Sequence, residues 1–231
     1  MRGFDARDLA AMDSTDMGLL SAAQVAALTS TQLRGIETAD IAGLGTEGLN
    51  QLSAAQIGAL TVAQVGALSS DQLLSLSTLQ VRGLGTAALA ALGTEALNHL
   101  TTEQFSTLST AQVAALSAGQ IAALSSDDMN ALTGAQFKAI NANAMAGFDS
   151  ADLAALTSAQ LAVFSTAQLR QIETADIDGL GTAALTGMST LQLAALTSSQ
   201  LAALGSEQVQ VLSSTQVRGL GTAQLAALGS D

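Results

Sequence analysis

Large apolar residues recur along this chain at a spacing of three, then five, then three again. When each position is named by the remainder of its residue number divided by eight, slot 4 runs from Phe4 to Leu228 and slot 1 from Met1 to Leu225. Both slots contain only Leu, Ile, Val, Met or Phe, and they include every Phe and Met of the sequence. The register is never interrupted, which predicts a single octad-repeat array over residues 1–231, with about 29 octads and no linker.

A longer repeat is superimposed on the octad. The segment VRGLGTAALAALG at Val81–Gly93 returns seventeen octads later as VRGLGTAQLAALG at Val217–Gly229. The segment IETADI occurs at Ile36–Ile41 and, at the same offset, at Ile172–Ile177. Residues 12–92 are thereby related to residues 148–228, which indicates duplication of a long block.

The octad spacing excludes both a half-buried strand and a continuous helix. A strand that buries one face needs apolar residues at every second position. In an unbroken α-helix, eight residues advance the chain by about 800°, so the apolar stripe would drift by ~80° per octad. The spacing therefore predicts a helix that is interrupted in every repeat.

Each octad also contains a signal for the start of a helix. Slot 5 is usually Ser or Thr and slot 0, three residues later, is usually Gln, as in Ser109 and Gln112. This is the capping box, and the apolar residues in slots 4 and 1 match the hydrophobic staple around it. Where slot 5 is acidic, slot 0 is Asp, so the same reciprocal cap is expected at five further octads, namely Asp5/Asp8, Asp13/Asp16, Glu37/Asp40, Asp149/Asp152 and Glu173/Asp176.

Helices of six or seven residues are unstable alone in water and need neighbours. Slots 1 and 4 would supply a shared apolar core, while the Ala and Gly residues common in slot 3 would let backbones approach closely. We therefore predict an all-α fold: a solenoid of about 28 very short helices, one per eight-residue repeat.

The composition narrows the function classes. The net charge is −12 and only 11% of residues are charged, which disfavours binding to nucleic acid or to an anionic membrane surface. No apolar run is long enough to cross a membrane, and residues 1–12 lack the apolar region of a signal peptide, so neither membrane insertion nor a signal peptide is expected. With no Cys, disulfides and thiolate metal sites are excluded.

Candidate chemistry is sparse. The strongest metal candidate is a group of four carboxylates in successive octads, which could bind Ca²⁺ through oxygen ligands: Asp5, Asp8, Asp13 and Asp16. We favour a capping role for these acids, because Asp is a good N-cap and no Ca²⁺-loop signature is present. His99 has no partner His or Cys, and the GLGT segments lack the Lys of a phosphate loop. We therefore expect no catalytic residue, no cofactor and no enzyme.

Leu79 and Leu191, both in slot 7, are large apolar residues outside the apolar slots, and so are Val62 and Leu74. They are candidates for contact with a partner or with a neighbouring copy, although single exposed apolar side chains also occur without any function.

The octad L-S-T-A-Q-V-A-A resembles the tandem repeats of long bacterial secreted or cell-surface proteins of adhesin type. This resemblance implies an extracellular or cell-surface structural array. The leading hypothesis is a non-enzymatic subunit or segment of a filament, stalk or surface layer. The alternative is a binding module that docks a protein or glycan along its solenoid face.

The ends of the chain keep the apolar slots, with Met1 and Phe4 at one end and Leu225 and Leu228 at the other. A terminal turn that keeps this pattern would expose the face that inner turns bury. We therefore expect a homo-oligomer or end-to-end polymer through head-to-tail association, unless the chain is a piece of a longer array.

Overall fold

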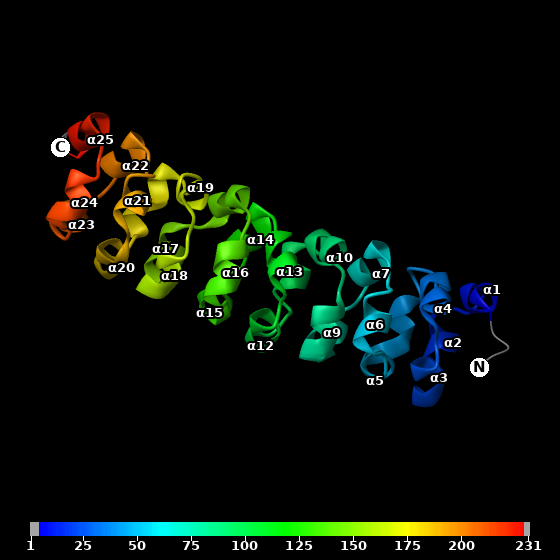
Figure 1. Ribbon diagram of the computed structural model, residues 1–231. Coiled ribbons are helices and arrows are strands. Elements are labelled where there is room, and N and C mark those ends of the chain that lie inside the picture. Colours follow the sequence, from blue (N-terminus) through cyan, green and yellow to red (C-terminus); the bar gives the residue numbers. More distant parts are fainter. Residues whose placement is uncertain (1–4, 229–231) are drawn as a thin grey trace. The chain divides into compact units, whose positions relative to one another are not determined.

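The computed structural model describes residues 5–228 of the chain, and within this range it consists of short helices with no strand (Figure 1). There are 25 α-helices and three 3₁₀ helices, each of four to six residues, so the described residues contain 28 short helices. The all-α fold with one short helix per octad is confirmed.

Two compact units divide the chain, the first ending at Ala115 and the second beginning at Leu116, inside an octad that keeps its register. The helices of the first unit are α1 (Ala6–Ala10), α2 (Ser14–Gly18), α3 (Ala22–Ala26), α4 (Ser30–Gly35), η1 (Ile41–Leu44), α5 (Gly45–Asn50), α6 (Ala54–Ile57), α7 (Val62–Gly66), α8 (Ser70–Ser75), α9 (Thr78–Gly83), α10 (Thr86–Ala91), α11 (Thr94–Leu97), α12 (Thr102–Ser106) and α13 (Thr110–Ala114). Those of the second unit are α14 (Ala118–Ala122), α15 (Ser126–Ala131), α16 (Gly134–Ala139), η2 (Ala142–Gly147), α17 (Ser150–Ala155), α18 (Ser158–Ala162), α19 (Thr166–Leu169), η3 (Thr174–Gly179), α20 (Thr182–Gly187), α21 (Thr190–Leu193), α22 (Ser198–Ala202), α23 (Ser206–Gln210), α24 (Ser214–Arg218) and α25 (Thr222–Ala227).

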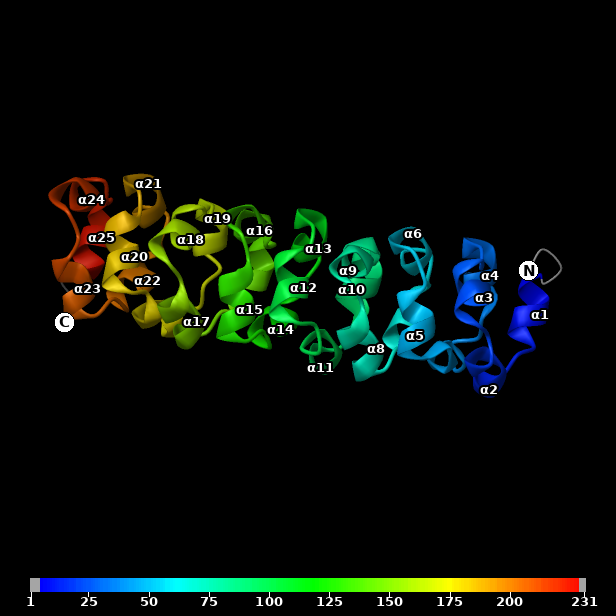
Figure 2. The same cartoon turned by 90° about the horizontal axis from the view of Figure 1, so that it is seen from below.

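In each unit, taken by itself, the chain winds as a coil, and each helix packs beside the helix about three octads further on (Figures 1 and 2). In the first unit α1 lies beside α4 and α6 beside α9; in the second, α18 lies beside α20 and α22 beside α25. Hydrogen bonds between turns join residues 25 to 31 positions apart, so one turn of the coil takes between three and four octads.

The core consists of the two predicted apolar slots. Slot 1 side chains from Leu9 to Leu201 are at most 1% exposed, and slot 4 side chains from Leu28 to Leu204 at most 7%. Three Phe rings pack together in the second unit, with centroids 5.7 Å apart for Phe137 and Phe164 and 6.0 Å apart for Phe148 and Phe164. The predicted core residues Met1 and Phe4 lie outside the described residues.

The predicted capping boxes are formed. At α13 the Ser109 backbone N–H donates to Gln112 Oε1 at 2.8 Å, and the Gln112 backbone N–H donates to Ser109 Oγ at 3.2 Å. The acidic caps at Asp5, Asp13 and Asp149 form the same reciprocal pair with the Asp three residues later. Each box satisfies two N–H groups that a helix start otherwise leaves without partners.

The predicted acidic caps at Glu37 and Glu173 are not formed, so these two predictions are wrong. The octads that begin at Glu37 and Glu173 form the 3₁₀ helices η1 and η3, and neither has a side-chain cap. Glu is not among the preferred N-cap residues, because its longer side chain does not fold back as Asp does. A third 3₁₀ helix, η2, follows Asn141, whose octad has Ala144 where the reciprocal Gln would stand.

Candidate functional site

The contact between successive turns is the most elaborate polar arrangement in the molecule, and the Gln side chains of slot 0 build it. Gln112 is 1% exposed. Its Oε1 caps its own helix, while its Nε2 donates to Val81 O at 2.8 Å and Leu84 O at 3.0 Å, at the end of α9 one turn earlier. A single side chain thus joins the start of one helix to the end of another.

The same bonds repeat through both units and form what we term the Gln ladder, the set of Gln side chains in slot 0 whose Nε2 reaches the previous turn. Gln64 donates to Leu33 O and Ile36 O, both at 2.8 Å, and Gln200 donates to Leu169 O at 2.9 Å and Ile172 O at 2.7 Å. The acceptors are backbone carbonyls at or near a helix end, where intrahelical partners run out. The slot 1 carbonyls among them also accept a backbone N–H of their own turn, as Leu33 O does from Ile36. The further members are Gln56, Gln72, Gln80, Gln104, Gln168, Gln192, Gln208, Gln216 and Gln224.

Glycines in slot 3 allow the turns to approach closely, as their small size predicts. A Cβ built on Gly83 would lie 2.9 Å from the carbonyl carbon of Ala54 and would overlap its oxygen, and one on Gly179 would lie 2.6 Å from Ser150 Cα. Both obstacles are backbone atoms of the previous turn, so only Gly fits at these contacts.

The two halves of the long repeat also share a contact between turns. Arg34 Nε donates to Ala59 O at 2.9 Å, and Arg170 Nε donates to Ala195 O at 3.0 Å. Both pairs have the same separation along the chain, and the second pair is the first shifted by the seventeen octads of the long repeat. The repeated block is therefore repeated in structure as well as in sequence at this contact.

The four N-terminal aspartates act as caps on two successive helices. Asp5 accepts from the backbone of Arg7 and Asp8, and Asp13 accepts from Thr15 and Asp16. Within residues 5–228 no three His, Cys, Asp or Glu side chains gather closely enough to hold a metal ion. Arg2, which precedes Asp5 in the sequence, lies outside the described residues.

Sequence reasoning missed an acidic cluster in the second unit, where two turns meet. Ser150 Oγ donates to Asp176 Oδ1 at 3.1 Å and to Asp178 Oδ1 at 3.2 Å. Burial raises the pKa of the Asp152 carboxyl above its ordinary value, against the lowering effect of the Asp149 backbone N–H, and the charges of Asp149 and Asp176 raise it further. The sequence signal was Asp178, the one acid in slot 2, where six other octads place Arg or Lys.

His99 has a half-buried position at the end of α11. It lines a shallow cleft of about 240 Å³ together with Ser70, Leu73 and Glu95. Glu95 is the one acidic side chain among the residues that line this cleft. The arrangement offers no nucleophile and base held by hydrogen bonds, which nucleophilic catalysis needs.

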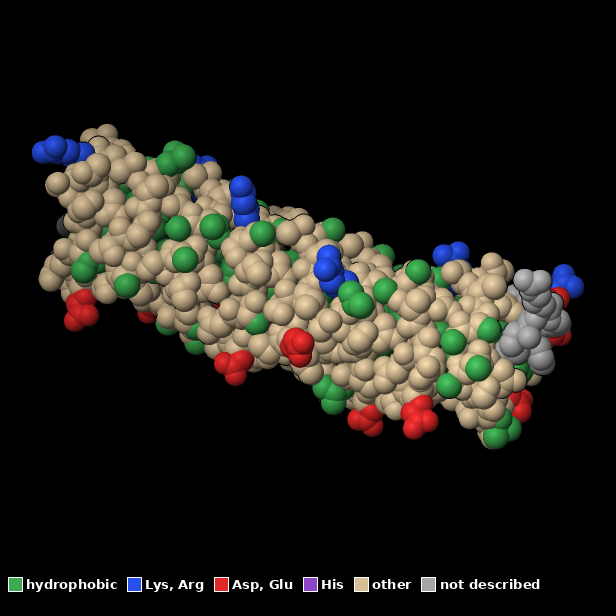
Figure 3. Space-filling view, turned by 60° about the horizontal axis from the view of Figure 1, so that its bottom comes forward, with side chains coloured by type: hydrophobic (Ala, Val, Ile, Leu, Met, Phe, Trp, Pro, Cys, Tyr) green, Lys and Arg blue, Asp and Glu red, His purple; other side chains and the backbone are tan. Residues whose placement is uncertain are grey.

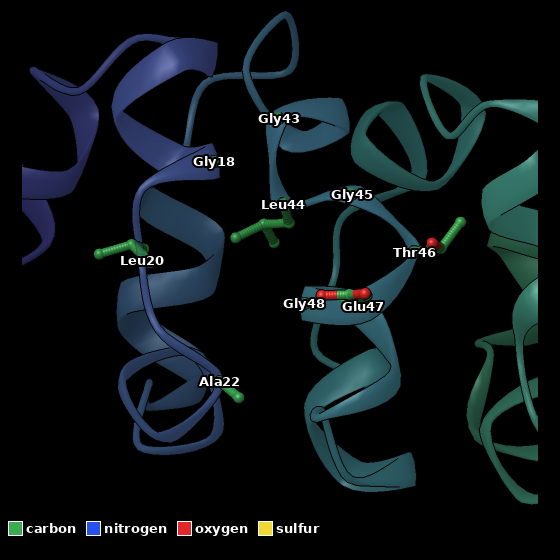
Figure 4. Close-up of a pocket in the computed structure, with 9 residues that line it drawn as sticks. All are labelled: Gly18, Leu20, Ala22, Gly43, Leu44, Gly45, Thr46, Glu47 and Gly48. Atoms are coloured by element: carbon green, nitrogen blue, oxygen red, sulfur yellow. The ribbon is translucent and has the colours of Figure 1, made fainter.

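A larger cleft of about 400 Å³ lies where η1 passes into α5, next to α2 (Figure 4). Four glycines line it, and one of them, Gly45, has a φ of +61°, a conformation that favours Gly. At the equivalent positions of the second unit, Ala184 and Ser158 replace Gly48 and Ala22. Ser158 Oγ there donates to Ala183 O at 3.1 Å, a hydrogen bond between two turns. The small residues at Gly18, Gly43, Gly45 and Gly48 therefore leave space for the cleft.

The four apolar side chains proposed as partner contacts are all exposed, by 68% for Leu79, 71% for Leu191, 45% for Val62 and 53% for Leu74. Sequence reasoning missed Leu19, which is 78% exposed although it follows α2 in slot 3, where Ala or Gly is usual. None of these side chains contributes to the core, so they remain available to a partner.

Charges separate onto opposite edges of each unit (Figure 3). A basic residue and the next acidic residue are often separated by about half a turn of the coil, which places them on opposite sides. Arg34 and Glu47 are separated in this way, and so are Arg82 and Glu95. Most of the visible Lys and Arg side chains accordingly follow one edge of a unit, and most of the visible Asp and Glu side chains follow the other.

Fold and contacts together define a tandem-repeat protein of the α-solenoid class. Comparison with protein families places the chain more narrowly, since seven segments match the ALTTAQ repeat: 33–70, 67–102, 75–110, 97–134, 106–142, 169–206 and 201–231. The matches cover most of the sequence, and the chain belongs to the ALTTAQ repeat family. No curated protein matches it. Among the helices of residues 5–228, none has the length and apolar character needed to cross a membrane.

Proposed function

We propose that the chain is a non-enzymatic structural repeat protein: a subunit or segment of an extracellular filament, stalk or surface layer that associates head to tail. The observation that supports this most is the Gln ladder, because it commits the repeated polar side chains to holding turn against turn. The family membership agrees with a repeat array. The bacterial, extracellular setting rests on the resemblance of the octad to adhesin-type repeats alone.

Head-to-tail association would extend the same contact between two copies. In the last turn, Leu225 is 40% exposed, whereas inner slot 1 side chains are fully covered. The carbonyls of Leu212 and Leu220 accept no ladder amide among the described residues. At the other end, Gln24 caps α3 through Oε1, but its Nε2 has no acceptor among the described residues. A second copy, or a further stretch of the same array, would complete both ends.

Light scattering and electron microscopy of the purified chain test this proposal. We expect open head-to-tail polymers whose mass grows with concentration, since a heterologous contact that does not close gives filaments. Appending to each end one octad with Lys and Glu in slots 1 and 4 should abolish them. Replacing Asp8 and Asp16 by Gln should strengthen them, because both side chains would then offer amides to the carbonyls of the preceding copy.

The alternative is a binding module for a protein or glycan, and the cleft beside Gly45 favours it. The two copies of the long repeat differ at this cleft, because Ser158 and Ala184 stand where the first copy has Ala22 and Gly48. A chain that stays monomeric at high concentration would contradict the filament proposal and favour this alternative.

A further inference from the structure

One corner of the first unit presents two exposed pairs of side chains on consecutive helices. On α8, Asp71 and Leu74 are three residues apart, and on α9, Leu79 and Arg82 are three residues apart. Residues three apart lie on the same face of a helix. Leu74 is 53% and Leu79 68% exposed, and both charged residues are exposed as well.

The charges at this corner have no partner within the described part of the chain. Neither Asp71 nor Arg82 forms an ion pair or a side-chain hydrogen bond with any other residue in the range 5–228. Leu74 is near the end of α8 and Leu79 near the start of α9, so both flank the short connection Leu76–Ser77. The corner therefore combines unpaired charges of both signs with two exposed apolar side chains.

We propose that this corner is a self-association site at which a second copy of the chain docks through the same four residues: Asp71, Leu74, Leu79 and Arg82. If α9 of one copy packs antiparallel to α8 of the other, Leu79 meets the partner's Leu74 and Arg82 meets the partner's Asp71. The order is Asp then Leu on α8 and Leu then Arg on α9, so only the antiparallel arrangement satisfies both pairs at once.

The arrangement is self-complementary and closed. Each α8 contacts the partner's α9, and each α9 contacts the partner's α8, which is the isologous geometry of a two-fold dimer. Two Leu–Leu contacts and two Arg–Asp ion pairs result. The contact is lateral and therefore separate from the head-to-tail contact, which involves the first and last turns.

Both copies carry net negative charge, which opposes the encounter. The opposite charges at the corner offset this repulsion locally and fix the orientation. The contact area is small, and interfaces below about 1,200 Å² are typical of weak complexes. We therefore expect the dimer at concentrations approaching millimolar rather than at low micromolar concentration.

A charge-swap experiment tests the site by sedimentation equilibrium on the full chain, in a background that carries the polar terminal octads to prevent head-to-tail growth. The parent protein should reach twice its monomer mass. Arg82→Glu should weaken dimerisation by about tenfold or more, because it places a Glu opposite the partner's Asp71 twice per dimer. The double variant Asp71→Arg/Arg82→Glu should restore the dimer, since the pairs are re-formed with the signs exchanged.

Two matched variants control for net charge and for hydrophobicity. Arg218→Glu changes the charge equally in the same slot of α24, and Leu191→Ser removes an equally exposed slot 7 leucine from α21. Both should leave dimerisation unchanged, whereas Leu79→Ser should weaken it by about tenfold. A parent that remains monomeric near millimolar concentration, or a double variant that fails to recover while circular dichroism shows it folded, would overturn the proposal.

Discussion

Replacing Gln112 by Ala is the most direct test of the ladder. The capping box alone would suggest a cost of about 0.5–1 kcal/mol. The structure implies more, because the buried Gln112 amide also donates to Val81 O and Leu84 O. At ~1 kcal/mol for each hydrogen bond lost, the three bonds predict a loss of about 3 kcal/mol in the free energy of unfolding. The cost stays in this range because the Leu84 carbonyl and the Ser109 N–H would be left without partners, while Val81 O would keep only the Leu84 backbone N–H.

Urea unfolding of the Gln112→Ala variant, followed by circular dichroism, measures this loss. Hydrogen exchange should be measured in parallel, because long repeat arrays can unfold in parts. Gln24→Ala is the matched control: Gln24 caps α3 in the same way but its Nε2 has no acceptor among the described residues. That variant should lose only about 0.5–1 kcal/mol. Equal losses for the two variants would refute the ladder as a source of stability.

Three further predictions address other contacts. Gly83→Ala should destabilise by about 1–3 kcal/mol in urea unfolding, because its Cβ would meet Ala54 O, whereas Gly66→Ala, with open space around it, should be neutral or stabilising. Because the pKa of Asp152 is raised in the folded state, the stability of the protein should increase as pH falls through the raised pKa and level off below the ordinary pKa of ~3.9. In thermal unfolding, Asp152→Asn should remove this contribution to the pH dependence, whereas Asp16→Asn should not. Calorimetry with Ca²⁺ should detect no binding tighter than about millimolar at the four aspartates of α1 and α2, and a micromolar site would overturn their assignment as caps alone.

Local features of this fold follow from the sequence because their causes are local. A capping box and a hydrophobic staple both act within one octad, so Ser109 and Gln112 could be read as a helix start from that octad alone. The same locality explains the two failures at Glu37 and Glu173. Their octads have acids at the right spacing, but Glu does not reach its own helix start as Asp does.

The size of a turn was not predictable in this way. It depends on which octads meet, and the partners of a ladder Gln lie 28 and 31 residues earlier in the chain. Nothing in a single octad specifies that distance. The acidic cluster at Ser150, Asp176 and Asp178 was missed for the same reason, because these residues come together only when one turn lies on the next.

One feature of the sequence nevertheless indicates the ladder. A capping box accepts Glu as readily as Gln, and the helix dipole favours a negative charge at that end. Slot 0 should therefore contain both amino acids, yet Glu is absent from slot 0 throughout the chain. A Glu carboxylate could accept the Ser109 N–H as Gln112 does, but it has no N–H with which to reach Val81 O and Leu84 O. Of the sixteen octads with a Ser or Thr cap, fifteen have Gln in slot 0 and none has Glu. This choice of Gln over Glu indicates a need for N–H donors, because the capping box itself uses only the side-chain oxygen.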